Sequence, residues 1–175
     1  MENMLAQLEP MIPALRRYAR GLLRDVEAAD DLVQDCLERV VSNWSGRKNE
    51  DPRTWVFTIL HNLAINRFRQ QTRRGHAVPL EDLPEQSFSV AASQEDTIFG
   101  KEVLTALDRL PPDHRGIILL ISVEDLSYAE AAKVLGVPLG TVMSRLSRAR
   151  EQLKAMLERS TIQPEADKPF LRRVK

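Results

Sequence analysis

The first 75 residues carry hydrophobic side chains three and four positions apart, which is the pattern of helices with one buried face. One apolar stripe ends near Asp25, and a second continues to Trp44. A third begins after Asp51-Pro52, a pair typical of a helix start. Cys36 lies on the second stripe, so we expect a small core residue there rather than a reactive thiol. The pattern predicts one small helical domain over residues 1–75.

Residues 76–97 show no such periodicity and contain Pro79, Pro84 and several acidic side chains. This composition, over a length unusual for a loop inside a compact domain, predicts a linker between domains. Apolar stripes return from residue 98, and they predict a second helical domain over 98–160 followed by a tail over 161–175. The predicted fold class is all-α: two small helical domains joined by a flexible acidic linker.

The second domain contains the signature of a helix-turn-helix. Ser127 and Glu130 have the spacing of a capping box, Gly136 suits the left-handed residue that ends a helix, and Pro138 suits the first turn of the next helix. The side chains expected to face inward are Ala129, Ala132, Val134 and Leu135 on the first helix and Val142, Leu146, Ala149 and Leu153 on the second.

The outward face of the second helix is polar and basic, with Thr141, Ser144, Arg145, Ser147 and Arg148. Hydroxyl groups and backbone N–H groups at a helix N-terminus suit phosphate contacts, and arginines can pair with guanine in the major groove. An ordinary solvated helical hairpin would also have a polar outer face. The combination of cap, glycine turn, apolar pattern and basic face favours DNA binding.

Composition excludes several classes of protein. The single cysteine rules out an internal disulfide or a cysteine zinc site, and the three histidines lack metal-ligand spacing. The sequence has no apolar run of membrane-spanning length, no phosphate-binding glycine loop and no arrangement of nucleophile and base. We therefore expect a cytoplasmic protein without a membrane segment, cofactor or metal, and a small helical enzyme is disfavoured.

Charge is segregated along the chain. The 175 residues hold 25 basic and 25 acidic side chains, and a net charge of zero taken alone argues against a nucleic-acid partner. Residues 25–38, however, hold six acids and no base, and 52–80 hold five bases and no acid. Residues 81–102 hold six acids against one base, and 138–175 nine bases against four acids. Any one block fits a solvated helix face, but four alternating blocks favour partners of opposite charge, since a partner senses local charge.

Two stretches of the sequence resemble a known family. Residues 126–132 and 136–150, with the lead-in 110–115, resemble region four of extracytoplasmic-function (ECF) sigma factors. Residues 30–37 resemble the region-two helix that docks on RNA polymerase, and 55–66 resemble the helix at the promoter's minus-ten element. The resemblance covers residues 12–157 in order. Its details are most similar to the alphaproteobacterial general-stress-response subgroup.

The resemblance implies a transcription-initiation factor rather than an enzyme. Such a protein binds the β′ and β subunits of core RNA polymerase, directs it to promoter DNA, assists melting and is gated by an anti-sigma factor. The linker would enter the polymerase channels with its acids in place of phosphates, or serve as a solvated tether. A plain helix-turn-helix regulator that acts without polymerase is the rival interpretation, but it leaves the acidic block unexplained.

The same resemblance implies roles for individual side chains. The implied polymerase-binding residues are Asp31, Gln34, Asp35 and Glu38. For the minus-ten element, a loop over 45–52 would capture a flipped base, and the candidates are Arg47, Lys48, Asn49, Asn62, Asn66, Arg67 and Arg69. For the minus-thirty-five element they are Thr141, Met143, Ser144, Arg145, Ser147 and Arg148. Trp55 fits base stacking, but its place on the apolar stripe favours core packing.

Overall fold

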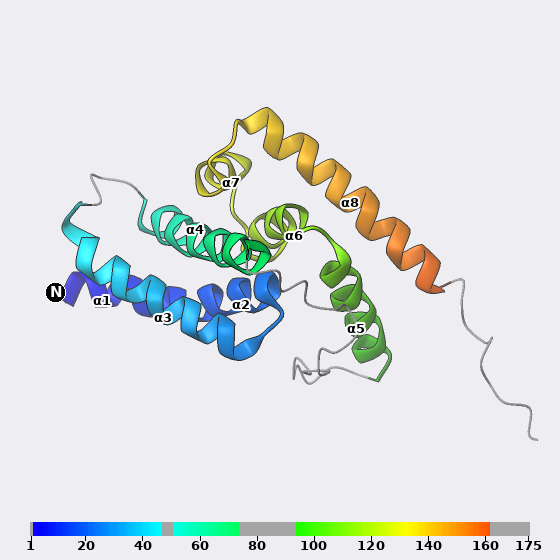
Figure 1. The fold of residues 1–175 in the computed structure, drawn as a ribbon, viewed down its shortest axis with the longest axis horizontal. Helices are drawn as coiled ribbons and strands as arrows, with labels where there is room; N and C mark the ends of the chain where they lie inside the picture. The colour runs from blue at the N-terminus through cyan, green and yellow to red at the C-terminus, as the bar shows by residue number, and fades with distance from the viewer. Residues whose placement is uncertain (1, 47–50, 74–93, 162–175) are drawn as a thin grey trace, which may run out of the picture.

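The N-terminal half folds into packed helices. In the computed structural model, which describes residues 2–46, 51–73 and 94–161, every element is helical, as predicted (Figure 1). None of the helices in those residues is both long enough and apolar enough to cross a membrane. The elements of the first half are α1 (Glu2–Leu8), η1 (Glu9–Met11), α2 (Ile12–Leu23), α3 (Val26–Asn43), η2 (Trp44–Gly46) and α4 (Pro52–Arg73).

Local side-chain chemistry explains where these helices begin and end. After α2 the chain reverses at Arg24, whose backbone is left-handed with φ 66°. The carboxylate of Asp25 then accepts a hydrogen bond from the backbone N–H of Ala28, 3.0 Å away, and caps α3. Asp51 does the same for α4, accepting from the N–H of Thr54 at 2.8 Å. The predicted helix start at Asp51-Pro52 is confirmed.

Within residues 94–161, the described part of the C-terminal half, the chain forms four α-helices and one π-helical turn. The helix α5 begins ahead of residue 98, where the sequence pattern places the end of the linker. The apolar stretch 117–123 is divided between the end of α6 and the π-helical turn η3. The elements are α5 (Gln94–Arg109), α6 (Pro112–Ile118), η3 (Leu119–Val123), α7 (Tyr128–Leu135) and α8 (Leu139–Thr161).

The predicted helix-turn-helix is present in α7 and α8. Ser127 and Glu130 form the full capping box, and Gly136 is left-handed with φ 63°. One part of the prediction is wrong: Ala129 is exposed, whereas Ala131 and Val134 are the buried residues of α7. Because successive helical residues are rotated by about 100°, the side that packs on the core lies opposite Ala129.

One hydrophobic core runs through both halves of the molecule. Buried Leu22 and Phe57 from the first half belong to the same cluster as Leu119 and Leu120 from the second. The helix α2 contacts α6 and η3, and α4 contacts α7. A Cβ atom at Gly21 would lie 2.9 Å from Leu119 Cδ1, so the missing side chain permits the close approach of α2 and η3. The two predicted helical domains are therefore packed against one another.

A buried arginine joins the ends of helices from both halves. Arg115 on α6 is 4% exposed, and its guanidinium donates to the carbonyl of Leu22, 2.8 Å away at the end of α2. It also donates to the carbonyls of Leu107, Asp108 and Leu110 at the end of α5, at 2.9–3.0 Å. Helix C-termini leave such carbonyls without partners and carry partial negative charge, so they suit a buried cation. Burial lowers the pKa of Arg115 to about 10, which leaves it charged at neutral pH.

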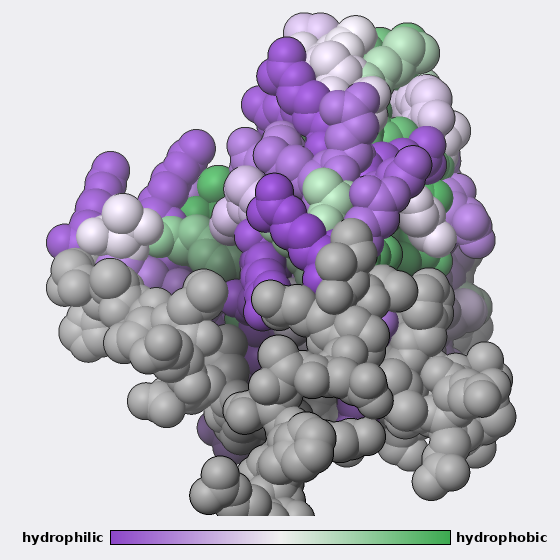
Figure 2. All heavy atoms as spheres, turned by 90° about the vertical axis from the view of Figure 1, so that its right-hand side faces the viewer, coloured by the Kyte–Doolittle hydropathy of each residue, from purple (hydrophilic) through white to green (hydrophobic). Residues whose placement is uncertain are grey.

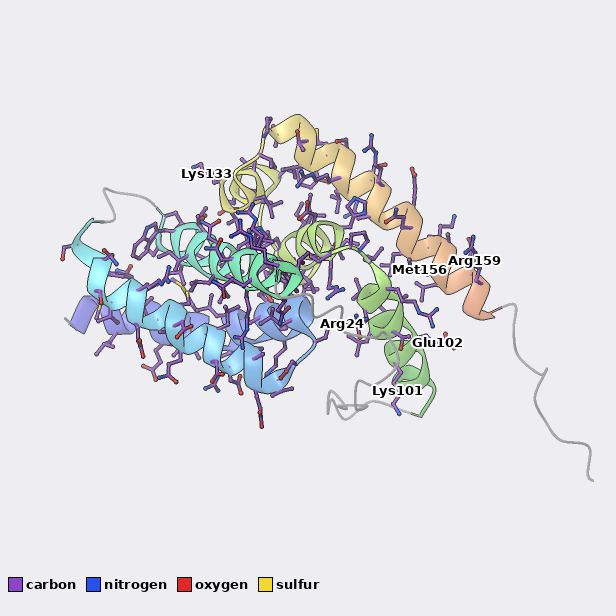
Figure 3. All side chains as sticks on the ribbon, viewed as in Figure 1. Arg24, Lys101, Glu102, Lys133, Met156 and Arg159 are labelled. Atoms are coloured by element: carbon purple, nitrogen blue, oxygen red, sulfur yellow. The ribbon has the colours of Figure 1, made fainter. Side chains whose placement is uncertain are left out.

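Near Arg115, an ion pair and a methionine attach α5 and α8 to the rest of the molecule. Arg24 at the end of α2 forms an ion pair with Asp108 on α5, with 2.9 Å between Nε and Oδ1. Met156 lies on the side of α8 that faces α5 and packs against the core (Figure 3). The second half is thus attached to α2 through its first helix as well as through α6.

The buried pair of Tyr18 and His61 lies where the halves meet. Tyr18 Oη and His61 Nδ1 are 2.9 Å apart, and a Cβ atom at Gly116 of the second half would be 3.4 Å from Tyr18 Oη. Burial lowers the pKa of His61 to about 4, a shift that Asp113 partly opposes. His61 is therefore neutral in the folded protein at physiological pH.

We expect acid to destabilise the fold through His61. Unfolded His61 takes up a proton near pH 6.5 whereas the folded chain resists until about pH 4, so the stability present above pH 6.5 is lost as the pH falls toward 4. Between pH 7 and pH 5 the loss amounts to about 2 kcal/mol. When urea unfolding is measured at pH 7 and at pH 5, the free energy of unfolding of His61→Gln should change by about 2 kcal/mol less than that of the wild type. His114→Gln is the control, and equal pH dependence in all three proteins would contradict the assignment.

Candidate functional site

The acidic block of α3 presents a row of exposed side chains. Asp31, Gln34, Asp35 and Glu38 are all exposed and follow the three- and four-residue spacing of one helix face. Gln34 donates to the carboxylate of Glu38 at 3.2 Å. Asp35 and Glu38 also line an open polar depression with Arg39, Ser42 and Asn43. The structure brings the four predicted residues together on one surface.

Two other acids of the same block are used by the fold itself. Asp25 caps α3, and Asp30 pairs with Arg20 of α2 at 3.1 Å. The block therefore divides by position: these two acids stabilise the ends and the packing of α2 and α3. The remaining carboxylates of the predicted site are directed to solvent.

The helix α4 presents three of the residues predicted to contact the minus-ten element. Asn62, Asn66 and Arg69 are exposed at spacings of four and three, so they lie on one face. Arg67 is half-buried, and its guanidinium donates to the carbonyl of Ala28 on α3 at 3.0 Å. The sequence pattern gives no hint of this contact. The candidates Arg47, Lys48 and Asn49 lie outside the described residues.

An aromatic pair flanks the segment between α3 and α4. Trp44 and Trp55 make an edge-to-face contact with ring centroids 6.1 Å apart, and both are half-buried against the core. This arrangement agrees with the packing role favoured for Trp55.

The N-terminal part of α8 presents most of the side chains predicted to read the minus-thirty-five element. Ser147 and Arg148 are exposed, as are Met143 and Ser144. Thr141 and Arg145 are half-buried on the flank nearest α6. There the guanidinium of Arg145 lies 3.6 Å from the carboxylate of Asp113. The sequence pattern does not distinguish these six residues, but the structure leaves four exposed on the outer face and two half-buried on a flank.

Hydrophilic side chains dominate the described part of the face that carries α5 and α8. Figure 2 shows this face, on which hydrophobic residues form small areas between polar ones. Exposed large apolar residues near the start of α8 are Leu139 and Met143, which are 45% and 49% exposed.

The described residues give no indication of metal or thiol chemistry. They contain no group of three histidine, cysteine or acidic side chains able to hold a metal ion. Cys36 is buried, donates to the carbonyl of Val56 at 3.7 Å, and has its pKa raised to about 12 by burial. The expected core role of Cys36 is confirmed.

Comparison with known proteins identifies the family. Residues 8–61 match the family model for the Sigma2 domain of PhyR, and residues 100–153 match that for Sigma-70, region 4. The ECF RNA polymerase sigma factor EcfG of Rhodopseudomonas palustris is 34% identical over 153 residues, or 83% of this chain and 80% of the relative. The chain belongs to the ECF RNA polymerase sigma factors.

Other relatives and solved structures agree with this membership. SigE of Mycolicibacterium smegmatis is 36% identical over 148 residues, covering 81% of this chain and 56% of that protein. The sigma factor RpoE from Bartonella quintana, solved with the anti-sigma factor NepR, superposes with a TM-score of 0.75 at 30% identity. That match covers 90% of this chain and 98% of RpoE. CnrH, solved with the cytosolic domain of CnrY, gives a TM-score of 0.61 at 26% identity over 89% of this chain and 88% of CnrH.

This sigma factor is a transcription-initiation factor that acts with RNA polymerase on promoter DNA. Its α1–α4 contain the sigma region 2 match, and its α5–α8 contain the region 4 match. We refer to these two helical sets as region 2 and region 4.

Three residues at the junction of the two regions carry no signal in the sequence pattern. The carboxylate of Glu124 is fully buried and accepts two hydrogen bonds from the Arg17 guanidinium, at 2.7 and 2.8 Å. Arg53 on α4 donates to the backbone carbonyl of Glu124. Arg17 and Glu124 are 107 positions apart, and no local pattern signals a pairing over that distance.

Proposed function

We propose that the exposed acids of α3 form the surface through which region 2 binds core RNA polymerase. The observation that supports this is the division of the acidic block, in which Asp25 and Asp30 stabilise the fold while Asp31, Asp35 and Glu38 remain in solvent. An exposed row of carboxylates on one rigid helix attracts a basic partner surface and fixes its register. Gln34 would add hydrogen bonding within the row.

Promoter recognition would be divided between α4 and α8. Asn62, Asn66 and Arg69 on α4 would contact the minus-ten element, and Ser144, Ser147 and Arg148 on α8 would contact the minus-thirty-five element. Arg67, Thr141 and Arg145 would have a smaller role, because contacts within the protein already orient or half-bury them. Arg47, Lys48 and Asn49 would serve a base-capturing loop.

The solved complexes of two similar sigma factors suggest how activity is regulated. RpoE was solved with the anti-sigma factor NepR, and CnrH with the cytosolic domain of CnrY. By likeness to them, this sigma factor would be held inactive in the cytoplasm by an anti-sigma factor. The decisive test of function is transcription in vitro with core polymerase across a pool of genomic promoters. A chain that binds core polymerase but initiates from no promoter would contradict the proposal.

The polymerase surface is tested by reversing two of its charges. Asp31→Lys with Asp35→Lys should weaken binding to core polymerase by about tenfold or more at low salt, because attraction becomes repulsion. Fluorescence titration against core polymerase measures the effect. Glu9→Lys with Glu158→Lys reverses the same charge at exposed sites elsewhere and should bind normally. If both double variants lose affinity equally, the loss reflects net charge and the assignment to α3 fails.

The promoter-reading surface is tested by removing its arginines. Arg148→Ala should cost roughly 1–3 kcal/mol in promoter binding by the holoenzyme and relax base preference at one position. Arg145→Ala should have the smaller effect, since Asp113 already engages that guanidinium. Arg159→Ala, at the far end of the same helix (Figure 3), is the control. Unchanged transcription from a cognate promoter in both Arg145→Ala and Arg148→Ala would rule out this assignment.

A further inference from the structure

Glu124 of region 4 occupies an anion-binding site on region 2. The site is built by Arg17 on α2 and Arg53 on α4, and both guanidinium groups point at this one residue. The Arg17 guanidinium forms a bidentate ion pair with the carboxylate, a geometry in which arginine also binds phosphate. The Glu124 side chain is fully buried, whereas the Arg17 side chain is 51% exposed. Arg17 thus holds the carboxylate inside the junction, and Arg53 holds the backbone carbonyl of the same residue.

The backbone around Glu124 has an unusual conformation. The residue directly follows the π-helical turn η3, and Asp125 after it is left-handed with φ 53°. Interruptions of this kind are costly and concentrate where a protein binds or switches. Here they direct an acidic side chain of region 4 into region 2.

The packed arrangement cannot be the one that reads a promoter. Elements centred near positions −35 and −10 lie about 25 base pairs, or about 85 Å, apart along B-form DNA. The surfaces proposed to read them lie on helices packed around one core, and the longest of these, α8, spans only about 35 Å. The two regions must therefore separate. Separation removes Glu124 from Arg17 and Arg53 and exposes both guanidinium groups.

We propose that Arg17 and Arg53 bind promoter phosphates once the regions separate, and that Glu124 takes the place of phosphate in the packed state. This inference rests on the proposed promoter-reading role of region 2. Arg53 lies in the first turn of α4, directly after the segment proposed to capture a base, so a strand entering there passes beside it. Opening exchanges one charge-assisted pair for another, so part of the interaction lost on opening is regained on DNA. We call Glu124 the latch, because its contacts hold the packed state together. Arg17 and Arg53 bind Glu124 in that state and promoter phosphates once the regions separate.

The two roles of Arg17 are separated by three variants. Glu124→Gln removes only the charge of the latch. Arg17→Ala removes the positive charge that is needed in both states. Arg17→Lys keeps a positive charge but cannot form the bidentate pair. Arg16→Ala is the matched control, since Arg16 is the preceding residue of α2 and is exposed. Arg17 is half exposed and glutamine is nearly isosteric with glutamate, so we expect all four variants to fold, which circular dichroism verifies.

Opening is measured in the free chain by energy transfer between dyes. Exposed Ser42 on α3 and Ala155 on α8 can be changed to cysteine for labelling, because native Cys36 is buried. Glu124→Gln and both Arg17 variants should lower transfer efficiency relative to the wild type and to Arg16→Ala. Wild-type efficiency in all three would overturn the latch, and this measurement needs neither polymerase nor promoter.

Phosphate binding is measured in the holoenzyme as the dependence of promoter affinity on salt. Arg17→Ala should reduce the log–log slope by about 0.7–0.9, the contribution of one phosphate, and weaken binding roughly fivefold. Glu124→Gln, Arg17→Lys and Arg16→Ala should keep the wild-type slope. The proposal is overturned if Arg17→Ala also keeps that slope, because Arg17 would then serve the packed state alone. Failure of the wild-type holoenzyme to bind any promoter would instead overturn the proposed function.

Discussion

The buried guanidinium of Arg115 is the constraint on which the packing of this sigma factor depends. It is held by carbonyls at the ends of α2 and α5, so one cation fixes where two helices from different regions stop. A buried charge without partners would cost several kcal/mol, and these carbonyls would be nearly as costly without a donor. The guanidinium and the helix-end carbonyls therefore depend on one another for hydrogen-bond partners. Removing Arg115 would leave carbonyls of both regions without their donor at once.

The zero net charge of the chain conceals a sorting of charges by task. Some charges complete the fold: Asp25 caps a helix, Asp30 neutralises Arg20, and Arg67 reaches across to α3. Others lie in solvent on single helix faces, the acids on α3 and the polar and basic groups on α4 and α8. A sum over the sequence cannot distinguish these uses. Their positions on the helices do.

Local chemistry made much of the fold predictable from sequence. The capping box at Ser127, the left-handed Gly136 and the helix start at Pro52 each depend on residues within one turn of each other. The prediction that Ala129 faces inward is wrong because periodicity identifies a helix but not the side on which other helices pack against it. Arg67 looked free for DNA because its partner, Ala28, is 39 positions away. The candidate surface residues were predictable as helix faces, but their occupancy by contacts within the protein was not.

The two buried charges at the junction of the regions differ in what they require. Arg115 is satisfied by carbonyls, which are fixed parts of the backbone, and three of its four partners belong to its own region. Glu124 is satisfied by side chains of the other region, and one of these is already half in water. On separation Arg115 gives up only the bond to Leu22, whereas Glu124 loses the Arg17 pair and the contact with Arg53. Glu124 therefore makes the packed state sensitive to whatever else can bind those arginines, and Arg115 preserves the internal geometry of region 4 through the change.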